Sequence, residues 1–111
     1  MEKEKNFVAI NTIDAEPEYI ERFEMLFKSR ARAIDTMEGF HSMQVLKPTL
    51  PGESYLIVSF WESEEHFRNW SNSPEFLEGH KRGFADLSKA KNEGKKPPMH
   101  SKFRTYTVLA R

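Results

Sequence analysis

The segment YLIVSFW, residues 55–61, constrains the fold more than any other part of the chain. Every residue in it except Ser59 is apolar or aromatic. A short run rich in aromatic and β-branched residues predicts a strand, and its near-continuous apolarity predicts that both faces of the strand are buried. The chain must therefore build a sheet around this strand and cover that sheet on two sides.

Three further segments are predicted to be strands, namely residues 6–13, 40–46 and 103–110. In the first of them the side chains alternate between two faces, so Asn11 falls on a face that is otherwise mostly apolar. Prolines and a glycine between residues 46 and 55 predict a turn that joins two neighbouring strands.

A long amphipathic helix is predicted within residues 14–40. Pro17 suits the first helical turn, where acidic neighbours match the helix dipole. Gly39 ends this element or begins the next strand. One apolar stripe with steps of three and four residues runs along the helix, through Ile20, Phe23, Phe27, Ala31 and Ile34.

Two more helices are predicted after residue 61. Ser63 can cap a short helix, and Ser73 followed by Pro74 places a cap and a first-turn proline at the start of a longer one. The Lys-rich residues 89–102 are expected to form a polar loop. The short helix carries Phe67 and Trp70, and one face of the longer helix carries Phe76, His80, Phe84 and Leu87.

The predicted order is β-α-β-β-α-β, which is the split ferredoxin-like α+β unit. We expect a single domain over residues 1–111. Helices cover only one face of such an open sheet, and pairing with a second copy by two-fold symmetry would cover the other. The sequence therefore predicts a homodimer whose two sheets meet as an α+β barrel.

Charge and cysteine content narrow the function. Lys and Arg together number 17, as do Asp and Glu, so the formal net charge is zero and no basic footprint for nucleic acid or an anionic membrane is present. The absence of cysteine excludes thiolate-bound zinc, iron–sulfur clusters and thiol nucleophiles. With no signal-peptide pattern or membrane span, we expect a cytoplasmic protein.

His80 is the residue best placed for chemistry, because it shares a helical face with three apolar side chains. A histidine in this setting is most often hydrogen-bonded at the edge of the core, but it can also act as a general base or a metal ligand. One histidine is too few for a zinc site built from protein alone, which takes about three or four ligands. It is enough for heme, whose porphyrin supplies the other nitrogens.

Trp70 and Asn11 each have two interpretations. Trp70 is either a large core or interface residue, or a wall against a flat aromatic ligand. Asn11 either bonds to neighbouring backbone, since a buried amide needs partners, or aims a donor at bound oxygen or substrate.

Three stretches of the chain resemble the antibiotic-biosynthesis-monooxygenase superfamily, and within it the heme-degrading monooxygenases of the iron-regulated surface determinant type. The resemblance extends from residue 7 to about residue 109. The first part of the longest stretch specifies the fold more than the chemistry. The combination of Asn11, Trp70 and His80 is more specific. The three stretches are FVAINTI, EGFHSMQVLKP and VSFWESEEHFRNWSNSPEFLEGHK.

The resemblance implies that Asn11, Trp70 and His80 form a catalytic set. By position, His80 would be the proximal iron ligand, Trp70 would press on the porphyrin and help to ruffle it, and Asn11 would hydrogen-bond the distal ligand. Apolar contact with the macrocycle would come from Phe23, Phe27, Phe76 and Phe84.

The implied reaction is oxygen-dependent opening of the heme ring with release of iron. Heme would be both substrate and cofactor, and electrons would come from an external reductant or reductase. Two other functions stay open. One is a cofactor-independent monooxygenase that acts on a small phenolic or quinol substrate, with His80 as general base. The other is a heme-binding protein without turnover.

Overall fold

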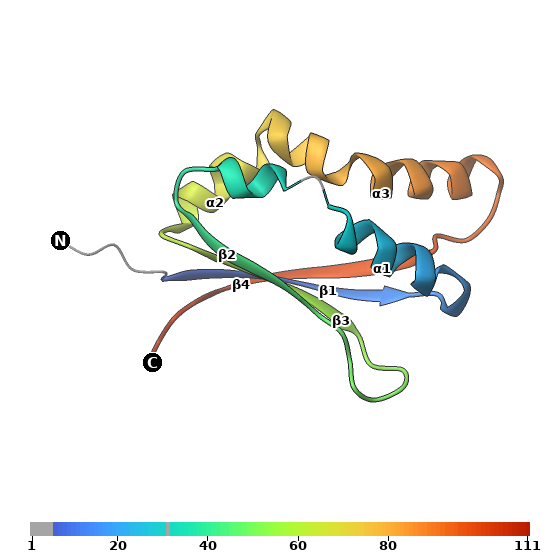
Figure 1. The fold of residues 1–111 in the computed structure, drawn as a ribbon, viewed down its shortest axis with the longest axis horizontal. Helices are drawn as coiled ribbons and strands as arrows, with labels where there is room; N and C mark the ends of the chain where they lie inside the picture. The colour runs from blue at the N-terminus through green and yellow to red at the C-terminus, as the bar shows by residue number, and fades with distance from the viewer. Residues whose placement is uncertain (1–5, 31) are drawn as a thin grey trace.

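The computed structural model describes residues 6–30 and 32–111. It contains an antiparallel four-stranded sheet in the order β2-β3-β1-β4, with the described helices on one face (Figure 1). The predicted α+β ferredoxin-like fold is confirmed. The elements are β1 (Phe7–Ala15), η1 (Pro17–Tyr19), α1 (Ile20–Lys28), η2 (Ala33–Thr36), β2 (Phe40–Leu46), β3 (Tyr55–Trp61), α2 (Glu64–Ser71), α3 (Pro74–Asn92) and β4 (Met99–Thr107).

β3 has the predicted bounds and lies inside the sheet, between β2 and β1. On its face toward the helices Tyr55, Ser59 and Trp61 are buried, and Trp61 has no exposed surface. On the opposite face Val58 is buried, but Leu56 and Phe60 are only half-buried, because the described helices all lie on the other side of the sheet (Figure 1). The predicted burial of β3 is thus confirmed on the side of the sheet that the helices cover. A second copy of the chain on the other side stays a prediction.

Two hydrophobic clusters lie between the sheet and the helices. The first contains Phe7, Ile34, Trp61 and Trp70. The second contains Ile13, Phe23 and Tyr55. β1 joins them, because it contributes Phe7 to one and Ile13 to the other. Asn11 lies between these two residues on the same face of the strand, as the alternation predicts.

The predicted long helix is wrong in its second half. The helical segment begins with the 3-10 turn η1, which contains Pro17, but α1 already ends at Lys28. Arg32 has a left-handed backbone with φ of 62°, which a continuing helix cannot contain. Ile34 therefore belongs to the separate turn η2, although it is buried in the first cluster. Ala31 of the predicted stripe lies outside the described residues.

The last helix and the last strand differ from their predicted bounds by several residues. α3 continues to Asn92, inside the segment expected to be a loop, and β4 spans Met99–Thr107 in place of 103–110. β4 is an edge strand that pairs only with β1 and has almost all its side chains exposed. Its place is set by backbone pairing with β1 and not by an apolar pattern.

The predicted helix caps are confirmed. The Ser63 hydroxyl accepts a hydrogen bond from the His66 amide, and the Ser73 hydroxyl accepts one from the Phe76 amide, each at 3.2 Å. Pro74 occupies the first turn of α3. Within the described residues, the helices are all too short or too polar to span a bilayer.

Candidate functional site

α3 presents a partly exposed row of aromatic rings. Phe76, His80 and Phe84 point to the same side of the helix, and the ring centroids of the two phenylalanines lie 4.0 Å and 5.4 Å from that of His80. We call these three residues the aromatic row. α3 has 19 residues but buries none of them, and Phe84 is 43% exposed. The row therefore offers apolar surface beside an imidazole.

His80 is held in one tautomer by its own helix. Its Nδ1 lies 2.7 Å from the carbonyl oxygen of Phe76. A carbonyl oxygen only accepts, so Nδ1 must carry the proton and donate it. In the neutral ring the lone pair is then on Nε2, which is the usual state of a metal-ligating histidine. The same atom could accept a proton from a substrate.

Trp70 lies next to His80 and also belongs to the core. Its ring centroid is 6.2 Å from that of His80, 5.4 Å from that of Phe76 and 6.5 Å from that of Trp61. Gly79 also faces the Trp70 ring, since a Cβ atom there would lie at an ordinary contact distance of 3.5 Å from it. Trp70 is 6% exposed, so it serves as a rigid support behind the aromatic row more than as an open surface.

Asn11 has a buried amide oxygen without a partner. Among the described residues, its Oδ1 is the buried side-chain polar atom that accepts no hydrogen bond. An unsatisfied buried polar group costs about 1–3 kcal/mol, so such groups in native proteins are informative. The amide was predicted to bond to neighbouring backbone, but its oxygen makes no such bond. A ligand that donates a hydrogen bond would satisfy it.

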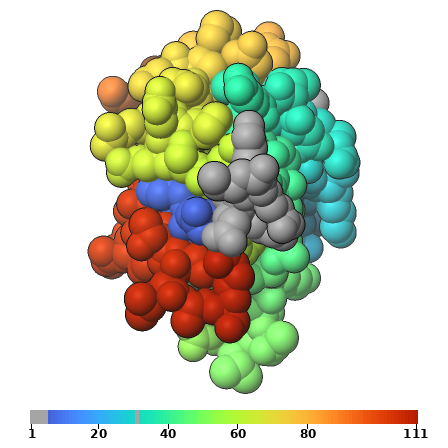
Figure 2. Space-filling view, turned by 90° about the vertical axis from the view of Figure 1, so that its left-hand side faces the viewer, coloured from blue at the N-terminus to red at the C-terminus, as the bar shows by residue number. Residues whose placement is uncertain are grey.

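Phe67 and Phe103 are aromatic neighbours that the sequence did not single out. Phe103 lies opposite Asn11 in the β1–β4 pairing, is 54% exposed, and stacks on Phe67 of α2 at a centroid distance of 5.4 Å. Phe67 also contacts Trp61, which leads on to Trp70. α2, the start of β1 and the end of β4 meet at this end of the molecule (Figure 2). The aromatic Phe103, in an edge strand whose neighbouring residues are Lys102 and Arg104, was the available signal.

Phe23 and Phe27 lie apart from the aromatic row. Phe23 is 1% exposed and packs edge-on against Tyr55 and Phe27 at centroid distances of 4.9 Å and 5.0 Å. Phe27 lines a cavity of about 280 Å³ between α1 and β2. The ring of Phe23 has almost no surface left for a ligand in this conformation, so contact between these two residues and a cofactor stays a prediction.

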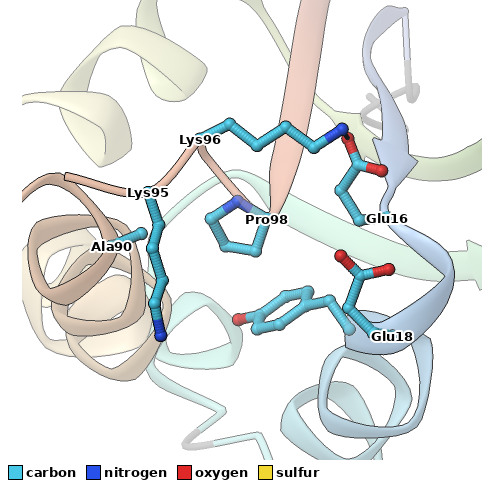
Figure 3. A pocket seen from close by; sticks show the side chains of 7 residues that line it. Glu16, Glu18, Ala90, Lys95, Lys96 and Pro98 are labelled. Carbon is cyan, nitrogen blue, oxygen red and sulfur yellow. Dashed lines mark ion pairs between the residues drawn. The ribbon is translucent and has the colours of Figure 1, made fainter. Parts of the chain in front are cut away.

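A larger cavity, of about 450 Å³, lies at the far end of α3 (Figure 3). Glu16 and Lys96 form an ion pair of 3.1 Å across its rim. Neither this cavity nor the smaller one is lined by Asn11, Trp70 or His80. The described histidine, aspartate and glutamate side chains also form no group of three that could hold a metal ion without a further cofactor.

Two tyrosine hydroxyls have raised pKa values. Burial, followed by a hydrogen bond to Glu24, raises the pKa of Tyr55 to about 12. Burial and a hydrogen bond to Asp86 raise the pKa of Tyr19 in the same direction. Burial pushes the pKa of Asp86 upward, but hydrogen bonds from Arg22 and Tyr19 outweigh it and leave that pKa below its usual value. Both tyrosines are therefore neutral structural donors.

The family is shown by comparison with known proteins. The sequence model of the antibiotic biosynthesis monooxygenase family matches residues 6–82, which include Asn11, Trp70 and His80. The chain belongs to this family. A curated relative, the mycobilin-producing heme oxygenase of Mycobacterium tuberculosis, is 37% identical over 67 residues. That match spans 60% of this chain and 64% of the relative.

Solved structures share the fold across nearly the whole chain. The heme-degrader MhuD of Mycobacterium tuberculosis, with two hemes bound, has a TM-score of 0.67 at 27% identity, covering 95% of this chain and 97% of that one. SnoaB of Streptomyces nogalater, a cofactor-independent oxygenase, has a TM-score of 0.64 at 21% identity, covering 96% and 93%. The second resemblance concerns the fold alone. The family match and the curated relative support oxygenase chemistry of the kind the family performs.

Proposed function

We propose that this protein is a heme-degrading monooxygenase, which opens the porphyrin ring with oxygen and releases the iron. The observation that carries the proposal is the Nε2 atom of His80, which its own helix keeps unprotonated in the neutral ring. It lies within a partly exposed row of aromatic side chains. The similarity in sequence to a heme oxygenase and in structure to the heme-degrader MhuD of Mycobacterium tuberculosis supports the same assignment.

The residues present fit a heme. His80 would hold the iron through Nε2, and Phe76 and Phe84 would contact the apolar macrocycle. Trp70 would back the site, since it is fixed between Trp61 and Phe76. The unpaired amide oxygen of Asn11, on the sheet face under the helices, would accept a hydrogen bond from a ligand or water on the heme.

Bound heme supplies the iron that activates oxygen and the carbon that is oxidised, with electrons from an external reductant. The protein's own part is to hold and orient. The carbonyl of Phe76 fixes the imidazole of His80, and the packing of Trp70 gives that side of the site a rigid wall. Asn11 provides a polar group where the surrounding strand face is apolar.

A second copy of the chain completes the proposal. The sheet face opposite the helices carries Val8, Ile10, Leu56, Val58 and Phe60, whose alternation places them away from the two core clusters. Pairing of this face with its symmetry mate would cover it and give a homodimer. The reductant, which is either a reductase or a small molecule, acts from outside.

The proposal is tested by titrating the purified protein with hemin, followed by ascorbate in air with catalase present. We expect saturable binding of about one heme per chain, then loss of the Soret band. His80→Ala should lose the ligated ferric spectrum and keep its fold. His41→Ala is the matched control, because His41 is an exposed histidine on β2 and should behave as the unchanged protein does.

Other outcomes select the other functions. A Soret band that persists with reductant would indicate a heme-binding protein without turnover. No hemin binding would point to the cofactor-independent monooxygenase with His80 as general base. Normal binding and turnover by His80→Ala would remove His80 from the iron.

A further inference from the structure

α3 is fixed to the rest of the molecule in an unusual way. A helix in a small domain is normally held by burying its apolar stripe, but α3 has no buried residue. The half-buried Phe76 packs the start of α3 on the first cluster. Further along, its bonds to α1 and to the residues that flank α1 are polar, and they come from Arg82 and Asp86.

Arg82 binds the end of α1. Its Nη2 donates to the carbonyl oxygens of Leu26 and Ser29 at 3.0 Å and 2.9 Å, and its Nη1 donates to the Ser29 hydroxyl at 3.0 Å. The last carbonyls of a helix have no partner within the helix, and a cation there is favoured by the helix dipole. The early end of α1 at Lys28 thus creates the acceptors that Arg82 occupies.

Asp86 makes the second attachment one helical turn further along. Its Oδ2 accepts hydrogen bonds from the Tyr19 hydroxyl at 2.5 Å and from Arg22 Nε at 3.0 Å, and Arg22 Nη2 lies 3.4 Å from its other oxygen. Charge-assisted bonds in a network fix geometry better than an isolated surface ion pair does. Together the two attachments restrain both the position of α3 and its rotation about its own axis.

That rotation decides where His80 points. At 3.6 residues per turn, Arg82 lies nearly half a turn and Asp86 roughly a third of a turn around the helix from His80. The attachments therefore hold one flank of α3 to α1 while the aromatic row faces away from it. If the flank is released, the imidazole is free to move with the helix.

We propose that Arg82 and Asp86 are positioning residues, which fix α3 so that His80 Nε2 meets the ligand at a defined place. This inference rests on the proposed function, since the ligand is heme. Neither residue is required to touch heme itself. Their effect is transmitted through the orientation of the helix that they share with His80.

The test uses Arg82→Lys and Asp86→Asn in the full chain, measured by hydrogen exchange without heme and by hemin titration and ascorbate-driven turnover. We expect faster exchange of amides 79–88, an altered ferric heme spectrum, and turnover that falls ~10-fold or more while affinity changes little, since small misplacements are costly. Lysine keeps the charge of Arg82 but cannot reproduce the forked set of donors on its guanidinium group. The heme spectrum of Arg82→Lys should therefore differ from that of the unchanged protein.

Arg68→Gln is the matched control, because it removes an exposed ion pair of 2.9 Å with Glu64 that lies within α2. It should leave exchange in α3 and turnover unchanged. Tyr19→Phe, which removes one hydrogen bond from Asp86, is the milder variant should the others fail to fold. Its spectrum should shift in the same direction.

The two ways of failing are distinct. If the unchanged protein does not bind hemin, the proposed function is overturned, and this inference with it. If that protein binds and degrades heme but the variants match it in spectrum and turnover, only the positioning role is overturned.

Discussion

α1 and α3 cover the same sheet in opposite ways. α1 has 9 residues and buries Phe23 almost completely, whereas α3 has 19 residues and buries none. The apolar side of α1 lies in the second hydrophobic cluster. The aromatic row of α3, which includes His80, stays partly exposed. The longer helix therefore contributes less to the core than the shorter one.

This difference assigns separate tasks to the two helices. Burial of an aromatic ring stabilises the fold by about 1.5–3 kcal/mol, and that contribution comes from α1. In the proposed function α3 presents the surface that binds heme, and polar bonds toward α1 help to hold it in place. Substitutions in α1 should thus act on stability, and substitutions in the aromatic row should act on heme.

The largest expected effect is on stability at Phe23. Phe23→Ala should lower the free energy of unfolding by about 3–5 kcal/mol, because it leaves a cavity in the second cluster. Phe84→Ala on α3 should cost less than about 1 kcal/mol, because that ring is already partly in solvent. Urea denaturation of both variants measures this, and equal losses would contradict the division between the helices.

Trp70 lies where the two tasks meet. Trp70→Phe keeps an aromatic ring in the first cluster, so the free energy of unfolding should fall by only about 1–2 kcal/mol. Ring opening should slow more than heme affinity falls, because the wall behind the heme is smaller. Hemin titration and initial rates separate the two quantities. A proportional loss of both would make Trp70 a binding residue only.

Asn11 should affect turnover without affecting the fold. Asn11→Ala removes an unsatisfied buried oxygen, so stability should change by less than about 1 kcal/mol or rise. The variant should still bind hemin but degrade it ~10-fold more slowly, as expected for a lost polar group at a reaction centre. Thr12→Ala, which changes the opposite strand face, is the control. Unchanged turnover in Asn11→Ala would remove Asn11 from the mechanism.

The smallest expected effect is a pH dependence on the α1 side. Tyr55 has a pKa raised from 10.0 to about 12 in the fold, so the folded protein retains a proton that the unfolded chain loses. Its contribution to stability is full below pH 10 and is lost as pH rises toward 12. Tyr55→Phe should flatten the fall in unfolding free energy over that range.

The fold was predictable because local patterns carried it. Apolar runs and cap residues predicted the order of strands along the chain and both helix starts at Ser63 and Ser73, which the structure confirms. The early end of α1 was not predictable, because Arg82 binds its carbonyls from more than fifty positions away. The start of β4 was missed for a similar reason, since only pairing with β1 specifies it.

The site was predictable in its residue types but not in its surroundings. Helical spacing placed His80 beside Phe76 and Phe84, and strand alternation marked Asn11 as a polar residue on an apolar face. Spacing alone shows which side of a helix a ring occupies, but it does not show whether that side faces the core or solvent. Phe23 has the same kind of spacing as the aromatic row, yet it packs against Tyr55 in the core.

The central claim is that α3 exists to present His80 to heme iron. Resonance Raman spectroscopy of the ferrous heme complex measures the iron–imidazole bond directly. The account predicts an iron–histidine stretching band in the unchanged protein and in His41→Ala, and its absence in His80→Ala. The same band in His80→Ala would show that another residue holds the iron, and that the exposed face of α3 has a different purpose.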